Sequence, residues 1–148
     1  MSGLDYEEQI SLWPELNEKV TINNVANFFK RTLPKMVRYS GRNITDLKSP
    51  TITDMPRGKT VGNVAETTIA RRLYAESVVK QTIKALNSCD NISREIITRL
   101  YFTNEKVGDK KVWQTSGYQE RRYYYYKNRA MLMFADSYLL DDLHVFEK

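Results

Sequence analysis

The sequence predicts an all-α protein: a helical bundle with a C-terminal helix-turn-helix and a long irregular loop in its N-terminal half. Two observations support this fold class. Apolar residues recur at spacings of three and four over long stretches, which is the period of one face of an α-helix. The 148 residues include only 6 glycines and 4 prolines, fewer than a sandwich or barrel with many tight turns normally contains.

The composition excludes several other classes of protein. Hydrophobic residues make up 41% of the chain, which argues against disorder. The single cysteine, Cys89, and the single histidine, His144, cannot form an intramolecular disulfide or a zinc site of Cys and His ligands. No apolar run approaches the length of about eighteen residues that a membrane span needs, and the acidic N-terminus lacks a signal core. We therefore expect a soluble, cytoplasmic protein with no membrane partner.

Residues 1–62 are predicted to form N-terminal helices followed by a loop. Asp5 and Glu8 have the spacing of a capping box, so a first helix should begin there and end or kink at Pro14. A second helix is expected to start after Thr21, because apolar residues from Ile22 to Val37 form one stripe.

The rest of this N-terminal segment is less regular. Pro34 lies inside the apolar stripe of the second helix and predicts a kink near Arg31–Leu33. Residues 40–62 hold three glycines and two prolines between serines and threonines, so we expect a long loop, with a brief strand at Thr51–Thr53.

Residues 63–91 are predicted to form a long central helix. Asn63 is placed to cap it and Glu66 lies three residues further on, so the helix should run from about Val64 to Leu86. Ile69 and Leu73 belong to its predicted apolar stripe. Two interpretations stay open: a core helix, or the interface of a homodimer, because one small domain does not easily cover both apolar sides of so long a helix.

Residues 92–148 are predicted to form a DNA-binding helix-turn-helix module with an acidic tail. The expected order is a helix capped by Ser93, a loop at Thr103–Asp109, a short helix at Lys110–Ser116, a turn at Gly117 and a last helix at Gln119–Leu140. Glycine suits this turn because it adopts positive φ without strain. Trp113 and Phe134 are expected to be buried together between the last two helices, so Trp113→Ala should cost about 3–5 kcal/mol.

The charge distribution favours a polyanion as partner of this module. Residues 93–135 contain nine basic and four acidic residues, a net charge of +5, whereas residues 136–148 contain four acids and one lysine. A solvated helical face is the simpler interpretation of such a cluster, so the charge permits binding to nucleic acid without requiring it.

The last helix has one apolar and one polar side. Its packed side is expected to contain Tyr123, Tyr126, Ala130, Met133 and Phe134. Its other side carries residue types that read base edges in the major groove: Gln119, Glu120, Arg121, Arg122, Tyr124, Tyr125 and Asn128. Four cations are expected to neutralise backbone phosphates: Lys110, Lys111, Lys127 and Arg129. Core tyrosines and a solvated arginine pair are the alternative interpretation.

Two segments also carry a specific pattern. The segment Gly117–Ala135 begins with a glycine turn, continues with aromatic residues and a lysine, and ends with an Ala-Met pair and a Phe-Ala pair. The residues that match the pattern are Tyr124, Lys127, Ala130, Met131, Phe134 and Ala135. In Ser49–Glu66, the pattern Ser-Pro, Asp-Met-Pro and Asn-x-x-Glu is carried by Ser49, Pro50, Asp54, Met55, Pro56, Asn63 and Glu66. In these two segments the chain resembles the ArpU family of phage transcriptional regulators.

This resemblance implies a helix-turn-helix similar to the fourth region of bacterial sigma factors. It also implies a late-gene activator of a phage or prophage of low-GC Gram-positive bacteria, which acts in the host cytoplasm with host RNA polymerase. The sequence departs from the family at Gln119, where the family carries a serine that caps the recognition helix, and glutamine is a poor cap.

Three functions remain in view, and none of them is enzymatic. The first is a transcriptional regulator that binds double-stranded DNA at a specific sequence. The second is a DNA-packaging subunit similar to a small terminase, and the third is a module that docks a phage or polymerase protein. We expect no catalytic residue, metal or cofactor, because His144 is the only histidine, glycine-rich phosphate motifs are missing, and Asp141 and Asp142 diverge on a helix.

Overall fold

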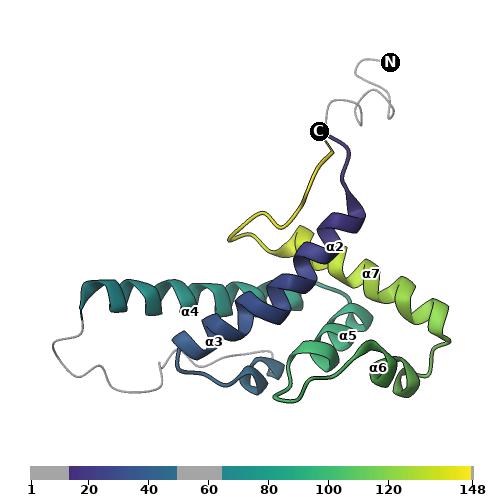
Figure 1. Cartoon of the computed structure of the whole chain (residues 1–148), viewed down its shortest axis with the longest axis horizontal. Coiled ribbons are helices and arrows are strands. Elements are labelled where there is room, and N and C mark those ends of the chain that lie inside the picture. Colours follow the sequence, from purple (N-terminus) through teal and green to yellow (C-terminus); the bar gives the residue numbers. More distant parts are fainter. Residues whose placement is uncertain (1–13, 50–64, 148) are drawn as a thin grey trace.

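The computed structural model describes residues 14–49 and 65–147 and is all-α (Figure 1). Its elements are α2 (Glu18–Asn27), the π-helical turn η1 (Phe28–Thr32), α3 (Leu33–Tyr39), the 3-10 helix η2 (Ile44–Lys48), α4 (Glu66–Asn87), α5 (Asn91–Tyr101), α6 (Asp109–Ser116) and α7 (Glu120–Ser137). The predicted first helix and the predicted strand at Thr51–Thr53 lie outside the described residues. The expected all-α class is confirmed.

The helices α2 and α3 follow one another through a single π-helical turn. α2 begins at Glu18, earlier than the predicted start after Thr21, because the Asn17 side chain caps it by accepting a 3.1 Å hydrogen bond from the Val20 amide. The polar first turn carries no apolar stripe, so periodicity did not reveal it. The predicted interruption before Pro34 takes the form of this π turn, in which the Leu33 amide donates to the Phe28 carbonyl, five residues back.

Only the second half of α4 is buried. It begins at Glu66, two residues later than predicted, and all its buried residues lie between Ala75 and Leu86. The first half projects past the rest of the protein (Figure 1), and the side chains of Ile69 and Leu73 are 42% and 65% exposed. These two residues were wrongly assigned to a buried stripe, because periodicity marks an apolar face without showing what covers it. A homodimer through α4 stays a prediction.

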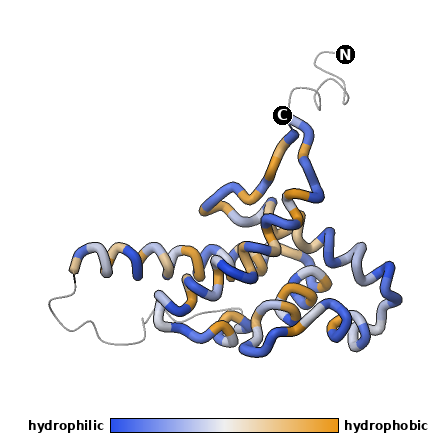
Figure 2. The backbone as a smooth tube through the Cα atoms, in the orientation of Figure 1, coloured by the Kyte–Doolittle hydropathy of each residue, from blue (hydrophilic) through white to orange (hydrophobic). Residues whose placement is uncertain are grey.

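The main hydrophobic core lies where α2, α4 and α7 meet (Figure 2). The ring of Phe134 is fully buried, with its centroid 4.6 Å from that of Phe29 and 5.7 Å from that of Phe28. A smaller core of Ile96, Leu100, Val112 and Tyr123 joins α5, α6 and the start of α7.

The predicted burial of Trp113 with Phe134 is wrong. Trp113 is only half-buried at the edge of the smaller core, whereas Phe134 belongs to the main core. The short α6 packs near Tyr123, and Phe134 lies eleven residues further along α7, a rise of about 16 Å. The predicted loss of about 3–5 kcal/mol in the free energy of unfolding for Trp113→Ala assumed a fully buried ring, so it no longer applies.

After α7 the chain turns back along α2 (Figure 1). α7 ends at Ser137 rather than at the predicted Leu140. The Asn24 side-chain amide donates to the Leu143 carbonyl at 2.8 Å, and the Val145 amide donates to the Thr21 hydroxyl at 2.9 Å. The returning segment thus covers one side of α2 and provides a hydrogen-bond partner for the buried hydroxyl group of Thr21.

His144 in this segment makes the stability of the fold depend on pH. Burial alone would lower its pKa, but hydrogen bonds from its ring to Asp136 (2.7 Å) and Asp142 (2.6 Å) outweigh burial and raise the pKa above 6.5. Because the folded state favours the protonated ring, this stabilisation is complete below about pH 6.5 and is lost as pH rises through the raised pKa. We expect the urea midpoint to fall over this range in the wild type and to change less in His144→Gln.

The ring titration can be measured directly, because the chain has one histidine. An NMR titration that gave His144 a pKa below 6.5 in the folded protein would contradict this account.

Candidate nucleic-acid interface

The helices α6 and α7 are joined by a tight turn. Gly117 closes α6 with φ of 84°, a left-handed conformation that favours glycine, and α7 begins three residues later. In the turn, the Tyr118 amide donates to the Ser116 hydroxyl at 3.1 Å, and the Tyr118 ring packs on Tyr126 with centroids 5.0 Å apart. The predicted turn at Gly117 is therefore confirmed. Gln119 stands at the N-cap without a side-chain hydrogen bond, as expected of a poor cap.

Asp109 at the start of α6 holds two side chains of α7. Its carboxylate accepts a 2.9 Å hydrogen bond from the Tyr123 hydroxyl and lies 2.7 Å from Lys127 Nζ. Tyr123 is fully buried, and burial together with the hydrogen bond to Asp109 raises its pKa. These contacts fix α6 against α7, and they neutralise one of the four cations that the sequence assigned to phosphates.

Asp90 links the start of α5 to α7 in the same way. Its side chain accepts a 2.8 Å hydrogen bond from the Ser93 amide and lies 3.1 Å from the Arg129 guanidinium. The Ser93 hydrogen bonds, and then the charge of Arg129, hold the pKa of Asp90 below its usual value. Asp90 is thus the cap of α5, and the prediction of Ser93 is wrong, because Ser93 is buried inside the first turn.

The polar side of α7 is open to solvent. Every residue predicted to read bases is exposed there: Gln119, Glu120, Arg121, Arg122, Tyr124, Tyr125 and Asn128. Arg121 and Arg122 form no ion pair within the described part of the chain, and with Gln119, Tyr125 and Tyr126 they surround a hollow of about 360 Å³. Lys110 and Lys111 are exposed on the first turn of α6.

The cations predicted to contact DNA therefore fall into two groups, according to whether they form an ion pair within the fold. Arg121, Arg122, Lys110 and Lys111 are exposed and have no carboxylate partner among residues 14–49 and 65–147. Lys127 and Arg129 form ion pairs that hold α7 in place. The first group can meet an anionic ligand without breaking an internal contact.

A curated protein aligns with most of this chain. It is "Putative autolysin regulatory protein ArpU" of Enterococcus hirae, which is 30% identical over 129 residues, 87% of this chain and 93% of that protein. The chain belongs to the ArpU family. The family resemblance that the two sequence motifs indicated is thus confirmed. No family model and no solved structure matches this ArpU-family chain.

Sequence analysis of the ArpU-family chain missed a second group of exposed cations. They lie on α3 and on the projecting half of α4, and include Lys35, Arg38 and Arg71. Their signal was present in the sequence, since residues 18–42 contain six basic residues and one acid, a net charge of +5. The signal is incomplete in the sequence, because Arg71 lies on α4, which a long intervening segment separates from α3.

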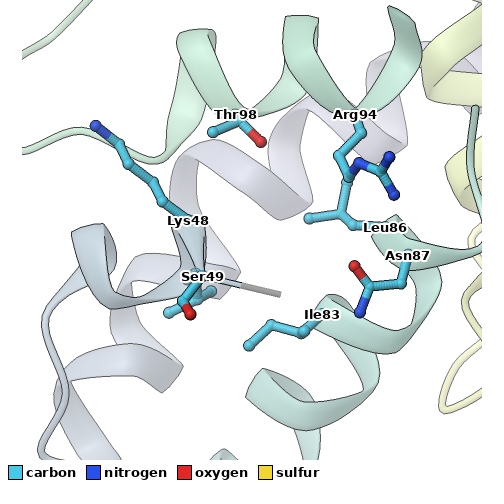
Figure 3. Close-up of a pocket in the computed structure, with 8 residues that line it drawn as sticks. Lys48, Ser49, Ile83, Leu86, Asn87, Arg94 and Thr98 are labelled. Carbon is cyan, nitrogen blue, oxygen red and sulfur yellow. The ribbon is translucent and has the colours of Figure 1, made fainter. Parts of the chain in front are cut away.

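This ArpU-family chain also has a cavity away from the polar side of α7 (Figure 3). The cavity has a volume of about 320 Å³ and lies between η2, α4 and α5, with Leu47, Ile83 and Leu86 as apolar lining and Arg94 and Thr98 contributed by α5. None of its lining residues comes from α6 or α7, so it is separate from the candidate interface. The structure describes no cluster of three metal-ligating side chains and no helix long and apolar enough to cross a membrane.

Proposed function

We propose that this ArpU-family chain is a transcriptional regulator that binds double-stranded DNA at a specific sequence, with α6, the turn at Gly117 and α7 acting as a helix-turn-helix. One observation carries the proposal: the exposed start of α7 holds two arginines that have no carboxylate partner among the described residues, beside the amide side chain of Gln119. The name of the Enterococcus hirae relative supports a regulatory role.

In this proposal, the first two turns of α7 enter the major groove. Arginine makes paired hydrogen bonds to guanine, and glutamine or asparagine makes them to adenine, so Arg121, Arg122 and Asn128 are the base-reading candidates. Lys110 and Lys111 contact backbone phosphates from the first turn of α6. Lys127 and Arg129 support the interface from within, because their ion pairs to Asp109 and Asp90 fix the angle of α7.

The family resemblance supports a more specific role. It implies that the target is a promoter of late genes in a phage or prophage, and that host RNA polymerase is a partner in the bacterial cytoplasm. A rigid, exposed recognition helix fits this role, since a base-reading surface must be held at a fixed angle to the DNA backbone.

The experiment is footprinting and competition binding with purified protein on a phage genome library at two salt concentrations. We expect one preferred site and an affinity that falls steeply with salt. Replacing Arg121 and Arg122 together with alanine should weaken binding to that site by about a hundredfold, since each arginine–guanine pair contributes about 1–3 kcal/mol.

The matched control is Lys19→Ala with Lys84→Ala, which removes two exposed cations from other helices. It should retain most of the site preference. No site preferred over bulk DNA, or an unchanged affinity of the Arg121→Ala, Arg122→Ala variant, would contradict the proposal. A ring of eight or more subunits would indicate DNA packaging instead, and loss of polymerase binding alone would indicate a docking module.

A further inference from the structure

Two cations from different helices each lie close to one exposed tyrosine ring. Lys35 Nζ of α3 lies 5.7 Å from the centroid of the Tyr39 ring, and the Arg71 guanidinium of α4 lies 5.6 Å from the same centroid. Arg38 is exposed on α3 between Lys35 and Tyr39 in the sequence. We call Lys35, Arg38, Tyr39 and Arg71 the α3–α4 basic patch. Cation–π contacts hold two of its charges within about 6 Å of the centroid of the Tyr39 ring.

The cations of this patch have no internal carboxylate partner in the part of the chain that the structure describes. Other cations in the fold do have such partners: Arg42 pairs with Glu76, Lys127 with Asp109, and Arg129 with Asp90. Lys35, Arg38 and Arg71 are instead exposed, and an external anion can reach them without breaking an ion pair among the described residues. Lys35 and Arg38 are like charges three residues apart on α3, and an anionic partner would offset their repulsion.

The patch has the composition of a phosphate-binding surface rather than of a protein interface. Protein interfaces have an apolar centre depleted in charge, whereas this patch consists of three cations and one phenol. The exposed aliphatic side chains of this part of α4 point elsewhere: Ile69 and Leu73 lie two residues from Arg71, about 200° away around the helix. Arginine, lysine and tyrosine are all common partners of backbone phosphates.

The position of the patch separates it from the candidate recognition helix. α4 begins at one end of the long axis of the molecule, and the α6–α7 turn lies at the other end (Figure 1). The patch therefore lies toward the opposite end of the molecule from the start of α7, so DNA that contacts it is a different stretch from the bases that α7 would read.

We propose that the α3–α4 basic patch binds the sugar–phosphate backbone of a second segment of duplex DNA, without reading its bases. This inference rests on the proposed function, because it takes DNA as the ligand. The second segment belongs either to the same molecule, bent back around the protein, or to another duplex.

The test is the salt dependence of binding to a duplex of random sequence. The patch variant is Lys35→Gln with Arg71→Gln, and the matched control is Lys19→Gln with Lys84→Gln, which removes the same charge elsewhere. Each lost phosphate contact lowers the slope of log affinity against log salt by about one. We expect the patch variant to lower the slope by about two and the control to change it by less than about half a unit.

The Arg121→Ala, Arg122→Ala variant separates this inference from the proposed function. It should lose site preference but keep the salt-dependent binding that the patch supplies. If it binds as the wild type does while the patch variant loses affinity, α7 is not the base-reading helix of the proposed function, whereas DNA remains the ligand and the patch inference stands. If the slopes of patch variant and control are equal, the patch inference is overturned.

Two further probes complete the test. Polyglutamate serves as an acidic polypeptide: weaker binding of polyglutamate by the patch variant, with unchanged DNA binding, would overturn the inference in favour of a protein partner. Energy transfer between two short labelled duplexes, seen with the wild type and lost in the patch variant, supports a second DNA molecule. Transfer only between labels on one long duplex supports bending of the same molecule.

Discussion

Replacing Phe134 with alanine should lower the free energy of unfolding by about 3–5 kcal/mol, a large part of the stability of a domain of this size. The Phe134 ring is completely buried and contacts the rings of Phe28, Phe29 and Tyr138, with centroid separations of 5.7, 4.6 and 5.4 Å. Truncation would leave a cavity where α2 meets α7, and stiff aromatic neighbours fill such a cavity poorly. Urea unfolding followed by circular dichroism measures the loss.

Phe146→Ala is the matched control, because it removes the same atoms from a side chain that is 44% exposed. It should cost less than about 1 kcal/mol. Equal losses for the two variants would show that the aromatic cluster does not hold α2 and α7 together as described.

Replacing Glu76 with glutamine should cost about 3 kcal/mol, because it removes a carboxylate that is ion-paired with the buried Arg42 guanidinium. The Arg42 side chain is only 4% exposed and that of Glu76 is 18% exposed. Two hydrogen bonds join them, from Nε at 3.2 Å and from Nη2 at 2.5 Å. The pair links the chain just after α3 to the middle of α4, so its loss should also loosen the projecting helix. Thermal and urea unfolding measure both effects.

Glu95→Gln provides the comparison for this charge removal. Glu95 is 69% exposed and its carboxylate lies 4.0 Å from Arg99, one turn along α5. Such a solvated pair contributes about 0.3–0.5 kcal/mol. A loss for Glu76→Gln as small as that for Glu95→Gln would mean that the charge of Glu76 is not what stabilises the buried Arg42 guanidinium.

The order of the C-terminal helices could be predicted from the sequence, because its signals are local. Gly117 marks a turn by its backbone freedom, and the arginines of α7 stand opposite its apolar stripe in a helical projection. What the sequence could not supply is the pairing of charges between helices. Lys127 and Arg129 look like free phosphate contacts until Asp109 and Asp90 are placed beside them, 18 and 39 residues away in the chain.

The errors in the predicted fold have related causes. The cap of α5 was assigned to Ser93, although Asp90 stands three residues earlier and is also a residue type that caps helices. Only the structure shows that the helix begins at Asn91, so that the Asp90 side chain accepts a hydrogen bond from the Ser93 amide. Ile69 and Leu73 have helical spacing, yet a helix longer than the body it packs against must leave some of its apolar face uncovered. The α3–α4 basic patch was missed because its charges come from two helices separated by a long intervening segment.

The hydrogen bonds between α2 and the residues after α7 have a consequence for biosynthesis. Thr21 and Val145 are 124 positions apart, so α2 receives this partner only after residues far along the chain have left the ribosome. Until then, that side of α2 is exposed to solvent and the nascent chain is accessible to proteases. Chains truncated before Val145 should therefore be less stable than the 148-residue chain and be degraded faster, because they lack these hydrogen bonds to α2.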